Sequence, residues 1–129
     1  MDFYQSWGTL EAGPNNRLVL NVCPDLTKFY YSLLPKAWRV QRQYHPPHLT
    51  VCRTGVEIPA VGVENFDGLT ASFLYSNVVD WDERYFWLNC WSQELEEVRS
   101  ILGLTIASRL TMPPPGHMKT FHITIGNIK

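Results

Sequence analysis

The sequence has little cysteine, no excess of charge of either sign and no long apolar run. Its three cysteines, an odd number without a C-x-x-C pair, exclude a disulfide framework or a cysteine zinc knuckle, and we expect all three to be small buried hydrophobes. Eleven basic and twelve acidic residues give a net charge of -1, so there is no positive field for long nucleic acid and any nucleotide partner should be small.

Apolar runs fall well short of the roughly 20 residues that a membrane span needs. The N-terminal residues have neither a basic n-region nor an apolar h-region, so they do not resemble a signal peptide. We therefore expect no membrane partner and a cytoplasmic location, which would be the host cytoplasm if the chain is viral.

The 129 residues, 45% of them hydrophobic, are enough for a single domain that spans residues 1–129. Period-two patterns predict strands at five places, and a turn rich in acidic residues joins two of them as a hairpin. The predicted strands are Arg17 to Val22, His48 to Arg53, Thr70 to Val79, Tyr85 to Trp91 and Phe121 to Ile125. With the two helices described next, this order of elements indicates an α+β fold.

Two amphipathic helices are predicted, one from Pro24 to Pro35 and one that begins after Ser92 as N-cap and ends near Gly103. The spacing of apolar residues predicts which side chains are buried. In the first helix they are Leu26, Phe29, Tyr30 and Leu33, and in the second Leu95, Val98, Ile101 and Leu102. The outer face of the second helix should carry Glu96, Glu97 and Arg99. No element is assigned to Thr105 to Met112.

One four-residue pattern occurs twice, at His48 to Val51 (HLTV) and at His122 to Ile125 (HITI). Side chains alternate between the two faces of a strand, so each histidine shares a face with the threonine two residues on, while the apolar pair faces the core. If the two strands lie side by side in a sheet, two imidazoles and two hydroxyls converge on one groove.

That set of groups suits phosphodiester cleavage. The reaction needs a base for the attacking hydroxyl or water and an acid for the departing oxygen, and histidine serves both roles near neutral pH. Threonine hydroxyls can donate to the phosphate oxygens as their charge grows in the transition state. This chemistry requires neither a metal nor another cofactor. A single H-x-T in a strand is ordinary, but two copies at corresponding strand positions are not.

The paired motifs resemble the 2H phosphoesterase superfamily, whose signature is two H-x-[ST]-x motifs. The resemblance implies a small pseudo-symmetric α+β fold in which antiparallel-rich sheets form a central groove flanked by two main helices. It assigns catalysis to His48 and His122 and phosphate binding to Thr50 and Thr124. The chain is most similar to small phage-encoded members of the RNA-repair-like or anti-CBASS nuclease type, although it lacks an obvious helix after the first motif, where Glu57 to Gly68 stands instead.

Further residues are candidates for substrate binding. Tyr85, Trp87 and Trp91 share one face of their predicted strand, where they could stack on bases or simply cover the core edge. Lys119 and Arg53 flank the motifs and could neutralise phosphate, although solvated strand ends are the plainer interpretation.

Two histidines and one loop complete the candidates. A metal site at His45 and His48 is disfavoured because the two prolines between them hold the segment extended. His45 and His117 are read as loop residues, and the proline-rich Pro113 to Lys119 segment as a flap over the groove or a connector.

The sequence therefore favours a metal-independent phosphodiesterase that cleaves small or cyclic oligonucleotides, such as cyclic-nucleotide immune signals. The alternatives are an RNA 2′,3′-cyclic phosphate or RNA end-processing enzyme and, in another class, a nucleotide-binding module without turnover. Base and linkage specificity, the identity of the general base and the oligomeric state stay open at this point.

Overall fold

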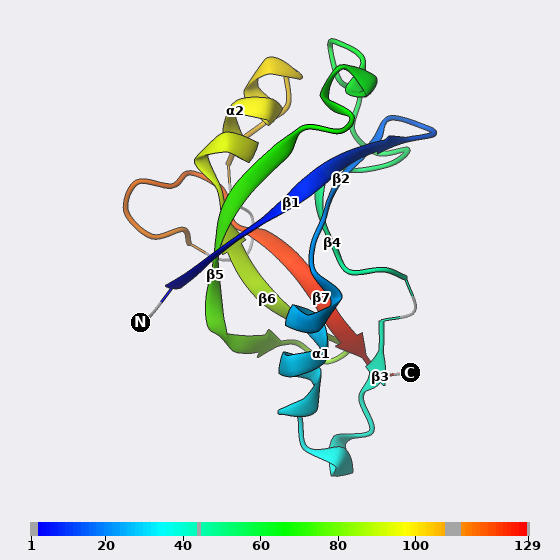
Figure 1. The fold of residues 1–129 in the computed structure, drawn as a ribbon, viewed down its shortest axis with the longest axis vertical. Helices are drawn as coiled ribbons and strands as arrows, with labels where there is room; N and C mark the ends of the chain where they lie inside the picture. The colour runs from blue at the N-terminus through cyan, green and yellow to red at the C-terminus, as the bar shows by residue number, and fades with distance from the viewer. Residues whose placement is uncertain (1–2, 44, 108–111, 129) are drawn as a thin grey trace.

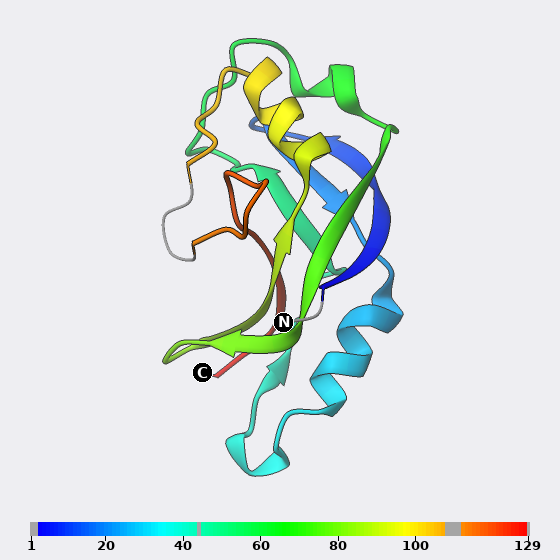
Figure 2. The ribbon, with the colours of Figure 1, turned by 90° about the vertical axis from the view of Figure 1, so that its left-hand side faces the viewer.

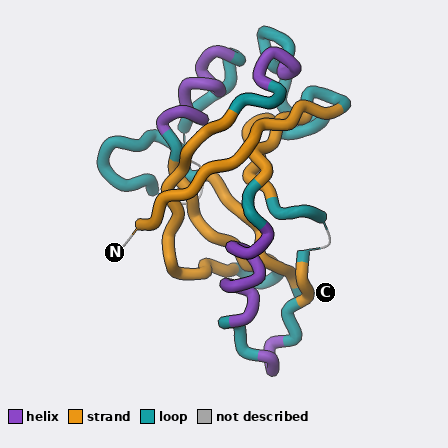
Figure 3. The backbone as a smooth tube through the Cα atoms, in the orientation of Figure 1, coloured by secondary structure: helices purple, strands orange, loops and turns teal. Residues whose placement is uncertain are grey.

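A computed structural model describes residues 3–43, 45–107 and 112–128. The protein is an α+β fold in which an antiparallel sheet closes into a six-stranded barrel (Figures 1 and 3). The barrel strands are β1 (Phe3–Gly13), β2 (Arg17–Asn21), β4 (His48–Cys52), β5 (Thr70–Trp81), β6 (Tyr85–Trp91) and β7 (Phe121–Asn127). The remaining elements are helices α1 (Pro24–Ser32) and α2 (Gln93–Ile101), the short strand β3 (Gln41–Arg42) and the 3-10 turns η1 (Lys36–Trp38) and η2 (Val63–Phe66).

The strands follow the order β7-β4-β2-β1-β5-β6, and pairing of β6 with β7 closes the ring. The expected hairpin is formed by β5 and β6, and its turn is fastened by the Asp82 carboxylate, which accepts from the amides of Arg84 and Tyr85. β3 pairs with the last residues of β7. Gly126 permits this approach, because a Cβ there would collide with the backbone oxygen of Gln41.

The core fills the inside of the barrel, and the two motif strands show how it is built. Leu49 and Val51 of β4 and Ile123 and Ile125 of β7 are all buried, at 0% to 2% exposure. The residues between them along each strand are half-buried on the outer face of the barrel. The predicted alternation of both motifs is confirmed, so the polar pairs of the two strands face away from the core.

The two helices lie towards opposite ends of the strands, α2 at the top and α1 at the bottom of Figure 2. Each buries fewer apolar side chains than its spacing predicts. In α1, Tyr30 is buried, whereas Phe29 and Leu33 are 57% and 60% exposed. In α2, Leu95 and Leu102 are buried but Ile101 is 54% exposed. α1 packs mainly against β7 and α2 mainly against β5, each along a narrow stripe, so the flanks of their apolar faces stay in solvent.

The predicted outer face of α2 is wrong for two of its three residues. Glu97 is exposed, but Glu96 and Arg99 are buried, at 8% and 3% exposure. Arg99 follows Leu95 by one turn and precedes Leu102 by three residues, so it lies within the buried stripe. Its charge is accommodated by hydrogen bonds to Val51, Glu57 and Thr105, which are described below.

The predicted ends of α2 are confirmed. The Ser92 hydroxyl caps the helix by accepting from the Leu95 amide. At the other end Gly103 has a φ of +75°, and the amides of Gly103 and Leu104 donate to the carbonyls of Ser100 and Arg99. These are the bonds of a Schellman motif, in which glycine tolerates the left-handed conformation.

The N-terminal strand β1 was not predicted. Its sequence mixes aromatic, polar and glycine residues, and only Gly8 and Leu10 are buried along it, so no regular apolar alternation marks it. Of the segment left unassigned, residues 105–107 and 112 have no regular structure and 108–111 lie outside the described residues. No helix among the described residues is long and apolar enough to span a bilayer.

Candidate active site

The structure brings the two His-x-Thr motifs together on neighbouring antiparallel strands. Leu49 of β4 pairs with Ile123 of β7. Continuing that antiparallel register by one residue in each direction sets His48 opposite Thr124 and Thr50 opposite His122. Each histidine thus lies across from the threonine of the other motif, and the four polar side chains form one cluster on the barrel surface.

A cavity of about 510 Å³ lies over this cluster. Both histidines and both threonines line it, together with Arg53 and Lys119 from the positions next to the motifs. A volume in the range of ordinary small-molecule sites, roughly 300 to 1,000 Å³, can hold a nucleotide-sized portion of a ligand. Four sequence-predicted residues and the two flanking cations therefore share one concave site.

His48 is oriented by the chain that leads into β4. Its Nδ1 lies 2.9 Å from the carbonyl oxygen of Pro46, the first of the two prolines before the motif. A carbonyl can only accept, so Nδ1 carries the proton of this bond and Nε2 is the nitrogen left for other chemistry. The stiff Pro46-Pro47 pair holds the accepting carbonyl in place.

His122 has a more enclosed environment. The ring of Trp87 on β6 meets its imidazole edge-to-face, with ring centroids 5.7 Å apart. Burial lowers the pKa of His122, Lys119 lowers it further, and Asp80 opposes the shift. Its Nε2 is buried and has no hydrogen-bond partner among the described residues. The ring is therefore biased towards the neutral form, with a nitrogen whose hydrogen-bonding capacity is unused.

Three side chains of β5 and β6 form a series of hydrogen bonds next to His122. Asn89 sits opposite His122 in the β6–β7 register. Its side chain accepts a hydrogen bond from Trp87 Nε1 at 2.9 Å and donates to the Asp80 carboxylate at 3.2 Å. These bonds fix the Trp87 ring that packs against the imidazole.

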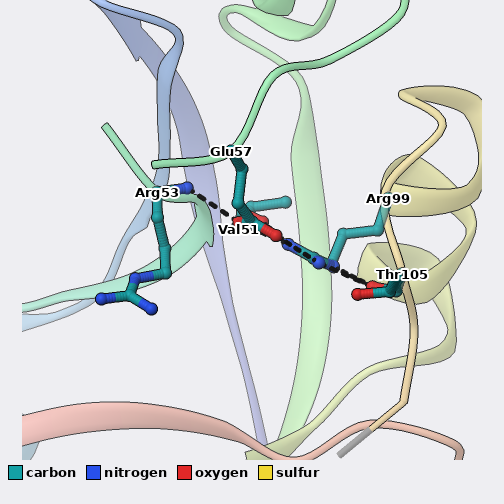
Figure 4. A network of polar contacts seen from close by, with 5 residues as sticks. All are labelled: Val51, Arg53, Glu57, Arg99 and Thr105. Carbon is teal, nitrogen blue, oxygen red and sulfur yellow. Dashed lines mark hydrogen bonds and ion pairs between the residues drawn. The ribbon is translucent and has the colours of Figure 1, made fainter. Parts of the chain in front are cut away.

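Arg99 of α2 ties together two walls of the cavity (Figure 4). It donates to the backbone oxygens of Val51 and Thr105 and forms a two-nitrogen ion pair with Glu57, the shortest contact being 2.7 Å. The Arg99 guanidinium holds the pKa of Glu57 below its ordinary value, and a hydrogen bond from the Arg53 amide adds to this effect. The network joins β4, the stretch after it and the stretch after α2.

Sequence reasoning missed Arg99 and Glu57. The signal for Arg99 was present, because a charged residue one turn after Leu95 and three before Leu102 belongs to the buried stripe of its helix. No local pattern identifies Glu57, since its partner lies 42 residues away.

Glu96 of α2 holds the loop before β7 in place, as Arg99 holds the β4 side of the cavity. Its carboxylate accepts hydrogen bonds from the amides of Met118 and Lys119, and His117 Nδ1 lies 3.9 Å from it. Gln93 donates to the Gly116 carbonyl in the same loop. The proline-rich Pro113 to Lys119 segment is thus fastened to α2, which fits a fixed connector better than a moving flap.

The aromatic candidates fall into three different environments. Trp91 is buried at 4% exposure, packs against Phe3 and donates from Nε1 to Thr120, so we withdraw the expected stacking on a base. Trp87 is half-buried and contacts His122 rather than lining the cavity. Tyr85 is 43% exposed, pairs with Asn127 at the far end of β7 and lies outside the cavity. β1 crosses beside the hairpin and covers Trp91, which the alternation of β6 alone could not reveal.

His45 and His48 do not form a metal site with a third ligand. Among the described residues, no three His, Cys, Asp or Glu side chains gather where they could hold a metal ion. His45 is exposed and lines a second, smaller cavity, while His117 is half-buried in the loop before β7. Of the cysteines, Cys52 and Cys90 are buried as expected, but Cys23 is exposed as the residue before α1.

In comparisons with protein-family models, with curated proteins and with solved structures, nothing matches this chain. What the site does must therefore be inferred from its own side chains.

Proposed function

We propose that this protein is a phosphoesterase of the 2H type, which cleaves phosphodiester bonds in small or cyclic oligonucleotides by two-histidine acid/base catalysis. One observation carries the proposal: both His-x-Thr motifs lie on adjacent antiparallel strands and line the same cavity. Two imidazoles supply the base and the acid, and two hydroxyls supply donors for the phosphate. No step of this chemistry needs a metal.

The surroundings of the two histidines support different roles. We assign the general base to His122, because burial favours the neutral form of its imidazole. His48 is then the general acid, because the Pro46 carbonyl accepts from its Nδ1 and leaves Nε2 as the nitrogen that delivers a proton to the leaving oxygen. Activity should then require one neutral and one protonated histidine and follow a bell-shaped pH profile.

The proposed step on a 3′–5′ linkage conserves atoms and charge. His122 removes the proton of the 2′-hydroxyl, and the oxygen forms a new bond to phosphorus. The bond from phosphorus to the 5′-oxygen breaks, and His48 gives its proton to that oxygen. The products are a 2′,3′-cyclic phosphate end and a free 5′-hydroxyl. Thr50 and Thr124 donate to the non-bridging oxygens as their charge increases.

Charge and cavity size favour a small substrate. The chain has a net charge of -1, whereas enzymes that hold long RNA use many phosphate contacts and lose affinity steeply with salt. A cavity of about 510 Å³ suits one nucleotide and its neighbouring phosphates. A cyclic oligonucleotide signal, degraded in the cytoplasm, is the substrate class we favour.

The test is a panel of cyclic di- and trinucleotides, 2′–5′ oligoadenylate, 2′,3′-cyclic mononucleotides and a structured RNA, with products identified by mass spectrometry. We expect a cyclic oligonucleotide with a 3′–5′ linkage to be cut fastest, with unchanged rates in EDTA and a shallow salt dependence. Faster processing of RNA ends, with affinity falling steeply between about 50 and 200 mM salt, would move the assignment to RNA repair. Binding without any product would identify a nucleotide-binding module and overturn the proposal.

A further inference from the structure

A second cavity of about 180 Å³ adjoins the candidate active site. Thr124 of β7, whose hydroxyl we propose to bind phosphate, lines both cavities, so the two cavities are neighbours at this residue. Its other walls come from α1, β3 and the segment that leads into β4. A ligand in the main cavity that contacts Thr124 therefore lies next to the second cavity.

The lining of this second cavity is basic. Lys28, Arg42 and His45 contribute to it, Thr27 and Gln43 add polar groups, and none of the described residues that line it is acidic. No ion pair joins Lys28 or Arg42 to a described acidic residue, in contrast to Arg99 and Arg17, which are paired. In a chain with net charge -1, a cavity lined only by cationic and neutral groups is a selective place for an anion.

Arg42 is held by its neighbours. Its guanidinium lies 5.5 Å from the centroid of the Tyr31 ring, and the Tyr31 hydroxyl donates to the Val40 carbonyl at 2.6 Å. The hydrogen bond fixes the ring, and the ring in turn supports the guanidinium by a cation–π contact. Such support lowers the entropy that Arg42 would lose on binding a phosphate.

We propose that this cavity is a second phosphate subsite, which binds the phosphate next to the scissile one through Lys28 and Arg42. A volume of about 180 Å³ is below the roughly 300 Å³ of whole-ligand sites, so it suits a phosphate group rather than another nucleotide. The inference rests on the proposed function and sharpens it: the preferred substrate carries at least two phosphates, as cyclic oligonucleotides do and 2′,3′-cyclic mononucleotides do not.

The kinetic test compares ApA, which has one phosphodiester, with pApA and ApAp, which add a phosphate at either end. Because charge-assisted contacts to a phosphate are strong, wild-type kcat/KM should be about 10- to 100-fold higher for one of the phosphorylated dinucleotides than for ApA. The double variant Lys28→Gln/Arg42→Gln should lose that preference through KM. Lys36→Gln, which removes an exposed charge outside both cavities, is the matched control and should keep it. An equal preference in wild type and double variant would overturn the subsite.

A binding test separates failure of the subsite from failure of the proposed function. Inorganic pyrophosphate is titrated into the intact protein while amide and arginine Nε–H signals are followed by NMR. The subsite predicts a shift of the Arg42 Nε–H signal in wild type and in Lys36→Gln, and a shift of the Gln43 amide, which lines only the second cavity, in these two proteins but not in the double variant. Such shifts without turnover of any panel substrate would sustain the subsite and refute the phosphodiesterase, whereas turnover without these shifts would refute the subsite alone.

Discussion

The two His-x-Thr motifs have nearly the same sequence but different surroundings. On β4, His48 is held by the segment that leads into the strand, through the carbonyl of Pro46 two residues earlier. On β7, His122 is enclosed by residues of β6 and of the preceding loop, which lower its pKa. A repeated motif therefore supplies two copies of one chemical group, and the neighbouring segments give the two copies different environments.

The two motif strands pair less with each other than with their other neighbours. β6 and β7 share six residue pairs and β2 and β4 share four, but β4 and β7 share only one, Leu49 with Ile123. Each motif strand is thus held in the barrel mainly by its other neighbour.

Removal of one imidazole at a time should have the largest effect. His48→Ala and His122→Ala should each lower kcat/KM on the identified substrate by about 10² to 10⁴, because a positioned acid or base contributes that much. Circular dichroism should show an intact fold in both variants. Wild-type turnover in either one would contradict the site.

A substrate whose leaving group departs without a proton then distinguishes the two histidines. On uridine 3′-(4-nitrophenyl phosphate), whose nitrophenolate departs unprotonated, His48→Ala should recover most of the lost rate and His122→Ala should not. The rate of nitrophenolate release measures this. Recovery in His122→Ala instead would exchange the roles that we assign.

The next largest effect is on the free energy of unfolding, and it concerns the hydrogen bonds that join α2 to the segments beside the two motifs. Arg99→Met breaks the ion pair and hydrogen bonds on the β4 side and should lower the free energy of unfolding by about 3 kcal/mol. Glu96→Gln on the β7 side keeps an oxygen acceptor and should cost about 1 kcal/mol. Urea unfolding measures both, with exposed Glu97→Gln as the matched control near zero. A larger cost for Glu96→Gln would contradict the assigned strength of the two attachments.

The two threonines allow a smaller and more symmetrical test. Thr50→Val and Thr124→Val preserve shape but remove a donor to the phosphate, and each should lower kcat/KM by about 10- to 100-fold. Thr→Ser at either position keeps the hydroxyl and should retain most activity. Loss of activity in the serine variants equal to that in the valine variants would show that shape rather than hydrogen bonding matters there.

The smallest expected effect is the pH dependence of stability. The pKa of His122 lies below its ordinary value in the folded protein, so the unfolded chain binds more protons as the pH falls. The contribution of His122 to the free energy of unfolding should be fully present above the ordinary histidine pKa of about 6.5. It should be lost as the pH falls from there towards the lowered pKa of the folded state. Tm measured at about pH 7.5 and 5.5, at constant ionic strength, should fall less in His122→Asn than in wild type. An identical fall in both would contradict the enclosed environment of His122.

The sequence predicted most of the sheet and the core of the candidate site because both depend on local patterns. Alternation located β2, β4, β5, β6 and β7, and the same period placed the histidines and threonines on a common outer face. The N-cap Ser92 and the left-handed Gly103 delimited α2 for equally local reasons.

What the sequence did not predict depends on contacts between distant residues. Closure of the barrel rests on pairing of β6 with β7, and β1 is a strand because β2 and β5 flank it. Burial of Trp91 requires Phe3, and burial of Arg99 requires Glu57. Except for β2, which follows β1 after a short loop, each of these partners lies dozens of residues away, where periodicity within one segment carries no information.

The pairing of Leu49 with Ile123 also has a consequence for how the protein folds. The two residues are 74 positions apart, whereas the β1–β2 and β5–β6 hairpins close over short loops. Contacts of such long sequence separation form late, because the entropy of closing a large loop must be overcome first. The two histidines thus meet only when the last strand has joined the sheet. On refolding from denaturant, the proposed phosphodiesterase activity should appear after the hairpins and report the final closure step.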